Sequence, residues 1–128
     1  MRTVYDTLSF VDKEGKVLSV KFFVSEQGQE PVRKWLKEEL TQEQRGAVGD
    51  DIKTVEFNWP IGMPIVRKIE PDLWEMRTKF QDGIARVFFT VQGARMILLH
   101  GITKKSQKTP EEALDTARKR LRSIKFGR

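Results

Sequence analysis

The chain has 128 residues and a formal net charge of +6, with 38% apolar and 33% charged residues. This length predicts a single domain over residues 1–128, with residues 1–15 as an added strand or a loose extension. The absence of cysteine excludes disulfides and thiolate metal sites, a single histidine excludes a His-rich metal site, and no stretch is long and apolar enough to span a bilayer. No signal peptide is recognisable, so we expect a cytoplasmic protein.

The positive charge is concentrated at the end of the chain. Residues 1–100 contain 15 Lys/Arg and 15 Asp/Glu, whereas residues 101–128 contain nine bases and three acids. A basic segment of this kind favours a polyanionic partner, such as nucleic acid or an acidic protein. A solvated helix face with a basic tail explains the charge equally well.

The first half of the chain predicts a strand followed by two helices. Residues 16–24 are rich in β-branched and aromatic residues, and they are expected to form a hairpin with residues 3–11. Pro31 is typical of the first turn of a helix, and the apolar spacing continues that helix to residue 40. Thr41 and Gln44 form the pattern of a capping box at the start of a second helix, which ends at the Pro- and Gly-rich residues 58–64.

The second half changes to the alternating pattern of strands. Residues 73–80, 84–91 and 94–103 predict an antiparallel three-strand meander, of which the third strand is apolar on both faces and therefore central. Residues 109–124 predict a last helix, with Thr109 as its cap and Glu112 completing a capping box. The expected fold is α+β, and we place Trp35, Trp59, Trp74 and Phe89 in its core.

Several motifs of this second half belong together in one known group. They are a Leu-Trp-Glu-x-Arg strand at residues 73–77, an arginine near the start of the next strand, Leu-Leu-His-x-x-x-Lys-Lys at 98–105, and Gln-Lys-Thr-Pro at 107–110. In these features residues 73–120 closely resemble the HigB-like, phage-associated branch of the RelE/ParE toxin superfamily. The resemblance implies a RelE-like fold.

The resemblance also implies a function. RelE- and HigB-like proteins are toxins of type II toxin–antitoxin systems, and most cleave mRNA on the ribosome without a metal ion or other cofactor. Cleavage proceeds by attack of the ribose 2′-OH on the adjacent phosphodiester. The implied partners are mRNA, the ribosome and a cognate antitoxin, often a helix-turn-helix DNA-binding protein. No membrane partner is implied.

The candidates for the catalytic site are Arg77, Arg86, Lys104, Lys105 and His100, with Glu75 as an alternative general base. Arg77 and Arg86 lie on adjacent predicted strands at the polar positions, so both side chains are expected on one face of the sheet. Lys104 and Lys105 follow at the end of the third strand, and such cations can stabilise a phosphorane. The general base stays open between His100, Glu75 and a lysine whose pKa neighbouring positive charge lowers. RelE proteins place a tyrosine in the last helix, whereas Tyr5 is the only tyrosine here.

A second group of basic residues is expected to bind RNA away from the scissile phosphate: Arg67, Lys68, Lys108, Arg118 and Arg122. The same residues equally fit a solvated surface or, on the last helix, an acidic antitoxin segment. Two other functions remain open at this point: inhibition of DNA gyrase by a ParE-like toxin, and RNA binding without catalysis.

Overall fold

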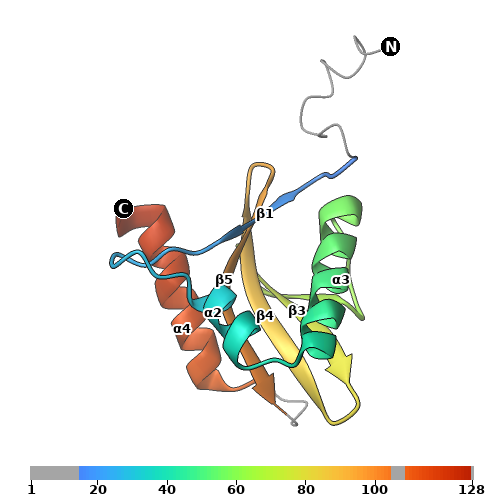
Figure 1. Cartoon of the computed structure of the whole chain (residues 1–128). Coiled ribbons are helices and arrows are strands. Elements are labelled where there is room, and N and C mark those ends of the chain that lie inside the picture. Colours follow the sequence, from blue (N-terminus) through green and yellow to red (C-terminus); the bar gives the residue numbers. More distant parts are fainter. Residues whose placement is uncertain (1–14, 105–108, 128) are drawn as a thin grey trace.

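The computed structural model describes residues 15–104 and 109–127, so the strand predicted over residues 3–11 lies outside the described residues. Within these limits the chain forms the predicted α+β arrangement (Figure 1). Its elements in chain order are β1 (Ser19–Phe22), α2 (Pro31–Glu38), α3 (Gln42–Asn58), β2 (Val66–Glu70), β3 (Leu73–Phe80), β4 (Gly83–Gln92), β5 (Arg95–Lys104), α4 (Glu111–Arg122) and a π-helical turn, η1 (Ser123–Gly127).

The strands form one sheet in the order β1-β5-β4-β3-β2. Strands β3, β4 and β5 are the predicted meander, and β5 lies inside the sheet, as its two apolar faces predict. Strand β2 adds a fourth antiparallel strand that the sequence pattern does not predict, because it is short and Pro71 follows it directly. Strand β1 is shorter than the predicted strand 16–24, and it pairs in parallel with β5.

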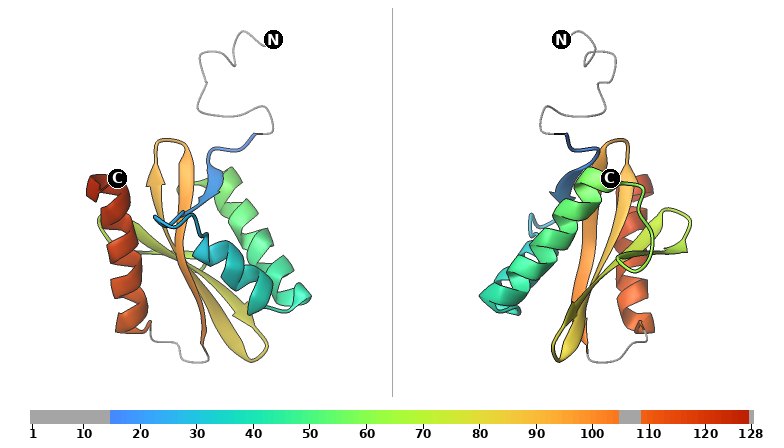
Figure 2. Two further views of the ribbon diagram at one scale, coloured as in Figure 1. Left: turned by 60° about the vertical axis from the view of Figure 1, so that its left-hand side comes forward. Right: turned by 90° about the vertical axis from the view of Figure 1, so that its right-hand side faces the viewer.

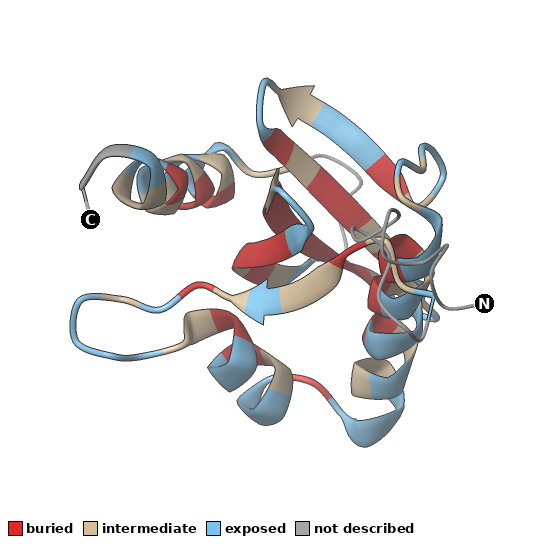
Figure 3. Ribbon diagram, turned by 90° about the horizontal axis from the view of Figure 1, so that it is seen from above, coloured by how far each residue is buried: buried red, intermediate tan, exposed pale blue. Residues whose placement is uncertain are grey.

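The helices cover both faces of this sheet. Helices α2 and α3 lie on one face and α4 lies on the other (Figure 2). The face toward α2 and α3 carries the larger apolar core, in which the sheet contributes Met76, Val87, Phe89 and Leu98. The face toward α4 carries a smaller core, formed by Leu73, Phe88 and Leu99 with Ala113, Ala117 and Leu121 of the helix. The two cores bury residues on both faces of the central strands, and the ribbon of these strands is accordingly coloured largely as buried (Figure 3).

The predicted starts of the first two helices are confirmed, and the four predicted aromatic residues lie in the core or pack against it. Pro31 occupies the first turn of α2, and both hydrogen bonds of the Thr41–Gln44 capping box are present at the start of α3. Trp35 and Phe89 are buried. Trp59 packs edge-on against Trp74, with ring centroids 5.1 Å apart.

A close approach between α2 and β5 requires glycine at position 101. A Cβ atom at Gly101 would lie only 2.5 Å from the Trp35 ring. Gly101→Ala is therefore expected to lower the free energy of unfolding by about 1–3 kcal/mol through overpacking, as measured by urea denaturation. Gly46→Ala is the matched control, because Gly46 lies exposed in α3 with open space around it, and alanine should stabilise that helix by about 0.5–1 kcal/mol. Equal effects of the two changes would contradict the close packing.

Candidate functional site

The strand register brings three arginines and one glutamate to the face of the sheet that α4 covers. Arg77 on β3 lies directly opposite Arg86 on β4, as the parity of the two strands predicts. On the other side of β3, Arg67 of β2 lies opposite Glu75. Side chains two apart on a strand share a face, so Glu75 and Arg77 point the same way. We call Arg67, Arg77 and Arg86 around Glu75 the arginine cluster.

The Glu75 carboxylate is the centre of this cluster. Its Oε2 accepts hydrogen bonds from Arg86 Nη1 at 3.0 Å and from the Thr109 hydroxyl at 2.8 Å. Its Oε1 accepts from Arg67 Nη2 at 3.3 Å and lies 4.0 Å from Arg77 Nε. Both carboxylate oxygens are thus engaged by cations or a hydroxyl donor. Among the residues that the structure describes, three guanidinium groups converge on one carboxylate, which leaves an excess of positive charge.

The three arginines differ in depth. The side chains of Arg86 and Glu75 are 0% exposed, whereas that of Arg77 is 18% exposed and that of Arg67 is 44% exposed. Like charges directly opposite each other on neighbouring strands are unfavourable, so Arg77 and Arg86 need the Glu75 carboxylate beside them. Arg86 is therefore placed to hold the Glu75 carboxylate from the buried side of the cluster. Arg67 and Arg77 are the members that a ligand in solution can reach.

Thr109 does not cap the last helix as predicted. Helix α4 begins one residue later than the predicted first turn, and Pro110 is its N-cap without a side-chain hydrogen bond. The Thr109 hydroxyl instead donates to Glu75 and accepts hydrogen bonds from Arg86 and Arg67, each at 3.1 Å. The capping prediction is wrong because a buried carboxylate competes for the same hydroxyl. Thr109 thereby anchors the start of α4 to the sheet.

The predicted lysines of the site fall at the edge of the described residues. Strand β5 ends at Lys104, whose backbone pairs with Ile84 beside the cluster strands. The side chain of Lys104 and the whole of Lys105 and Lys108 lie outside the described residues. Their convergence with Arg67 and Arg77 stays a prediction.

His100 is held apart from the arginine cluster by a different partner. The register of β5 against β4 shifts at Leu99, between the Phe89–Leu98 and Phe88–His100 pairs, and Arg120 of α4 reaches this bulge. Arg120 Nη1 donates to the Leu99 carbonyl at 2.8 Å and contacts His100 Nδ1 at 3.2 Å. Arginine can only donate, so Nδ1 accepts and Nε2 carries the ring proton. Burial and the Arg120 charge lower the His100 pKa to about 4. This environment disfavours His100 as the general base.

The His100 site predicts a pH dependence of stability. The unfolded chain binds the imidazole proton near pH 6.5, and the folded protein binds it only near pH 4. The unfolded state holds more protons between these values, so the free energy of unfolding falls as the pH drops from about 6.5 to about 4. Urea denaturation across this window should show a smaller fall for His100→Asn, whose amide oxygen can still accept from Arg120. Identical slopes in the two proteins would contradict the lowered pKa.

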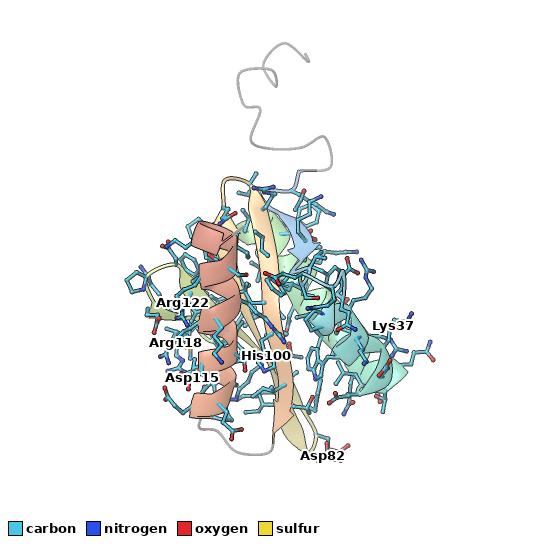
Figure 4. All side chains as sticks on the ribbon, turned by 90° about the vertical axis from the view of Figure 1, so that its left-hand side faces the viewer. Lys37, Asp82, His100, Asp115, Arg118 and Arg122 are labelled. Carbon is cyan, nitrogen blue, oxygen red and sulfur yellow. The ribbon has the colours of Figure 1, made fainter. Side chains whose placement is uncertain are left out.

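The other predicted RNA-binding residues are placed separately. Arg118 is engaged by three carboxylates, those of Glu70, Glu111 and Asp115, which raise its pKa. Its charge is therefore largely compensated by the protein itself. Lys68 lies over the Trp74 ring at 5.7 Å. Arg122 is exposed on α4, and Arg118 lies on the same helix (Figure 4).

Sequence reasoning missed the roles of Thr109 and Glu75. It considered Glu75 only as a base or as a surface carboxylate, whereas the residue is buried. A signal was available, since Glu75 shares its strand parity with Arg77 and faces a sheet side rich in arginine. Nothing in the local sequence distinguishes Thr109 from an ordinary helix cap.

The element order and the sheet are consistent with a RelE-like fold. Residues 34–122 match the family model described as phage derived protein Gp49-like (DUF891), and the chain belongs to this Gp49-like family. The family is a RelE/HigB-like family of toxins in toxin–antitoxin systems, which implies an antitoxin as partner. The search of curated proteins found no match. None of the described helices has the length and apolar character needed to cross a membrane.

Proposed function

We propose that this chain is a toxin endoribonuclease of the HigB-like branch, acting on mRNA at the ribosome and neutralised by a helix-turn-helix antitoxin. The observation that carries the proposal is the convergence of Arg67 and Arg77 at an accessible edge above the buried Glu75–Arg86 pair. Arginine forks bind phosphate oxygens two at a time, and fixed cations are the main requirement for phosphodiester cleavage. Membership of a toxin family supports the same assignment.

The chemistry required of the site is modest. The 2′-oxygen attacks phosphorus, its proton passes to a base, the bond from phosphorus to the 5′-oxygen breaks, and that oxygen receives a proton. The products are a 2′,3′-cyclic phosphate and a 5′-hydroxyl. In this scheme Arg77 binds the nonbridging oxygens of the reacting phosphate, whose negative charge increases in the transition state, and the more exposed Arg67 binds the RNA beside it. Arg86 and Glu75 hold these two side chains in place.

Glu75 is excluded from the role of general base by its surroundings. The carboxylate is 0% exposed and both of its oxygens already accept hydrogen bonds, so a 2′-hydroxyl cannot reach it. We therefore assign Glu75 to positioning. Lys104 or Lys105 is the base in this proposal, because crowding by the arginine cluster would favour a neutral lysine.

The proposal is tested by mapping RNA ends. Induction of the chain in bacteria should arrest growth and produce new mRNA 5′ ends that carry hydroxyl groups, as read by primer extension and by ligation that distinguishes 5′-hydroxyl from 5′-phosphate ends. Cleavage by the purified protein with ribosomes should persist when transition-metal ions are removed by a selective chelator while the Mg²⁺ that ribosomes themselves need is kept. Intact RNA under all these conditions would overturn the nuclease assignment. Inhibition of supercoiling in a purified gyrase assay would instead point to the ParE-like activity.

A further inference from the structure

A groove separate from the arginine cluster lies between α4 and the loop that follows β1. The hollow has a volume of about 550 Å³. Its walls are Phe23, Ser25, Glu26 and Gln27 from the loop side, and Thr116, Lys119, Arg120 and Ser123 from α4. The loop and α4 border the same end of the molecule (Figures 1 and 3). We call this hollow the α4 groove.

The groove contains a half-buried cation, Arg120, that no carboxylate of the described residues neutralises. Arg120 Nη1 donates to the Leu99 carbonyl and to His100, and its guanidinium carbon lies 5.6 Å from the centroid of the Phe23 ring. Within the described ranges, no carboxylate forms an ion pair with Arg120, and its Nε and Nη2 make no hydrogen bond. Arg118, two residues earlier, has three carboxylate partners. A partly buried guanidinium of this kind is completed best by an incoming carboxylate.

The groove continues along an apolar surface with basic edges. A second hollow of about 270 Å³ shares Phe23 with the first, and it is lined by Lys21, Phe22, Val24, Arg95, Ile97 and Ile124. Val24 is 37% exposed at this place. The two hollows together present one acid, Glu26, against the four bases Lys21, Arg95, Lys119 and Arg120. The surface therefore combines apolar contact with a net positive charge.

We propose that the α4 groove binds an acidic segment of a protein partner, with a carboxylate on Arg120 and Lys119 and an apolar side chain against Phe23. A central apolar contact with a charged rim is the usual composition of protein interfaces. An RNA backbone fits less well, because it would place a row of phosphates next to Glu26 and over an apolar floor. The identification of this partner as the antitoxin rests on the proposed function. The existence of the binding site does not.

The test uses purified full-length protein and a random peptide library displayed on phage. Selected peptides are expected to contain Asp or Glu next to bulky apolar residues, and titration calorimetry gives the affinity of the best one. Lys119→Glu should lower the affinity for that peptide about tenfold, because it places a glutamate next to the acidic residues of the peptide. Lys53→Glu is the matched control, since it makes the same charge change on the exposed surface of α3 outside the groove, and the affinity of this variant for the peptide should stay within about twofold.

A second pair of variants tests the opposite wall. Gln27→Glu adds a negative charge to the loop wall and should also lower the affinity for the peptide. Gln42→Glu, on the exposed start of α3, should leave that affinity unchanged. All four substituted side chains are exposed, so the fold should be preserved, and circular dichroism verifies this. Peptide binding needs no cleavage, and therefore its outcome is independent of the nuclease assay.

Several results would overturn the proposal. One is a selection that enriches no acidic peptide. Another is an acidic peptide whose affinity is the same for the groove variants and their controls. A third is binding of a single-stranded RNA oligonucleotide that Lys119→Glu and Gln27→Glu weaken while no peptide binds, since this would make the groove an RNA surface.

Discussion

Glu75→Ala is expected to lower the free energy of unfolding by about 3–5 kcal/mol, the usual cost of removing one partner from a buried ion pair. The change removes the Glu75 carboxylate from the buried Arg86, which lies directly opposite Arg77. It also removes the acceptor of the Thr109 hydroxyl, which links α4 to the sheet. Urea denaturation measures the loss, and Glu43→Ala is the matched control because Glu43 lies exposed in the first turn of α3.

The double variant Glu75→Leu/Arg86→Met separates burial of charge from loss of packing. Replacing both members of a buried pair by apolar residues of similar size often costs little, so the double variant should be more stable than either single variant. Arg67 and Arg77 remain, but both are partly exposed and water can solvate them. Additive losses from the two single changes would show that the pair does not act as a unit.

The sequence predicts most of the fold because local signals and tertiary packing agree. Pro31 and the Thr41–Gln44 capping box specify helix starts by local hydrogen bonding, and no distant residue competes for them. Alternation over residues 73–91 specifies strands and their faces in the same way. The parallel pairing of β1 with β5 is different, since two strands that are distant in the chain meet only through the packed core. No local pattern indicates such a contact.

The sequence predicts which face of the sheet carries the site residues, but it does not predict how deeply each of them is buried. Strand parity places Arg77 and Arg86 on one face, and the register confirms this. Parity cannot show that Thr109 closes over Arg86, because that depends on the tertiary path of the chain into α4. In the proposed function, this burial makes Arg86 a positioning residue in place of the phosphate ligand that the sequence predicts. The same contact makes Arg86→Ala unsuitable as a catalytic test, since lost activity would be indistinguishable from lost stability.

Arg77→Ala is the substitution with the largest expected effect on catalysis. If Arg77 binds the scissile phosphate, its removal should reduce the cleavage rate by about 10²–10³-fold, which is typical for loss of one charge-stabilising donor. Because its side chain is partly exposed and its strand neighbours remain, the free energy of unfolding should change much less than in Glu75→Ala. Single-turnover cleavage of a ribosome-bound mRNA measures the rate, and Lys53→Ala on the exposed surface of α3 is the control.

Arg77→Lys distinguishes a bidentate contact from simple charge. Lysine keeps the positive charge but lacks the planar fork of arginine. If Arg77 holds the phosphate by two parallel hydrogen bonds, Arg77→Lys should cleave RNA as poorly as Arg77→Ala. If only the charge is needed, Arg77→Lys should recover most of the wild-type activity. Arg67 is more exposed and lies on the edge strand β2, so Arg67→Ala should weaken RNA binding more than it slows the chemical step. If Arg77→Ala cleaves RNA at the wild-type rate and Arg67→Ala is inactive, the reacting phosphate must be assigned to Arg67 on β2 and not to Arg77 on β3. The Glu75–Arg86 pair would then serve the fold alone.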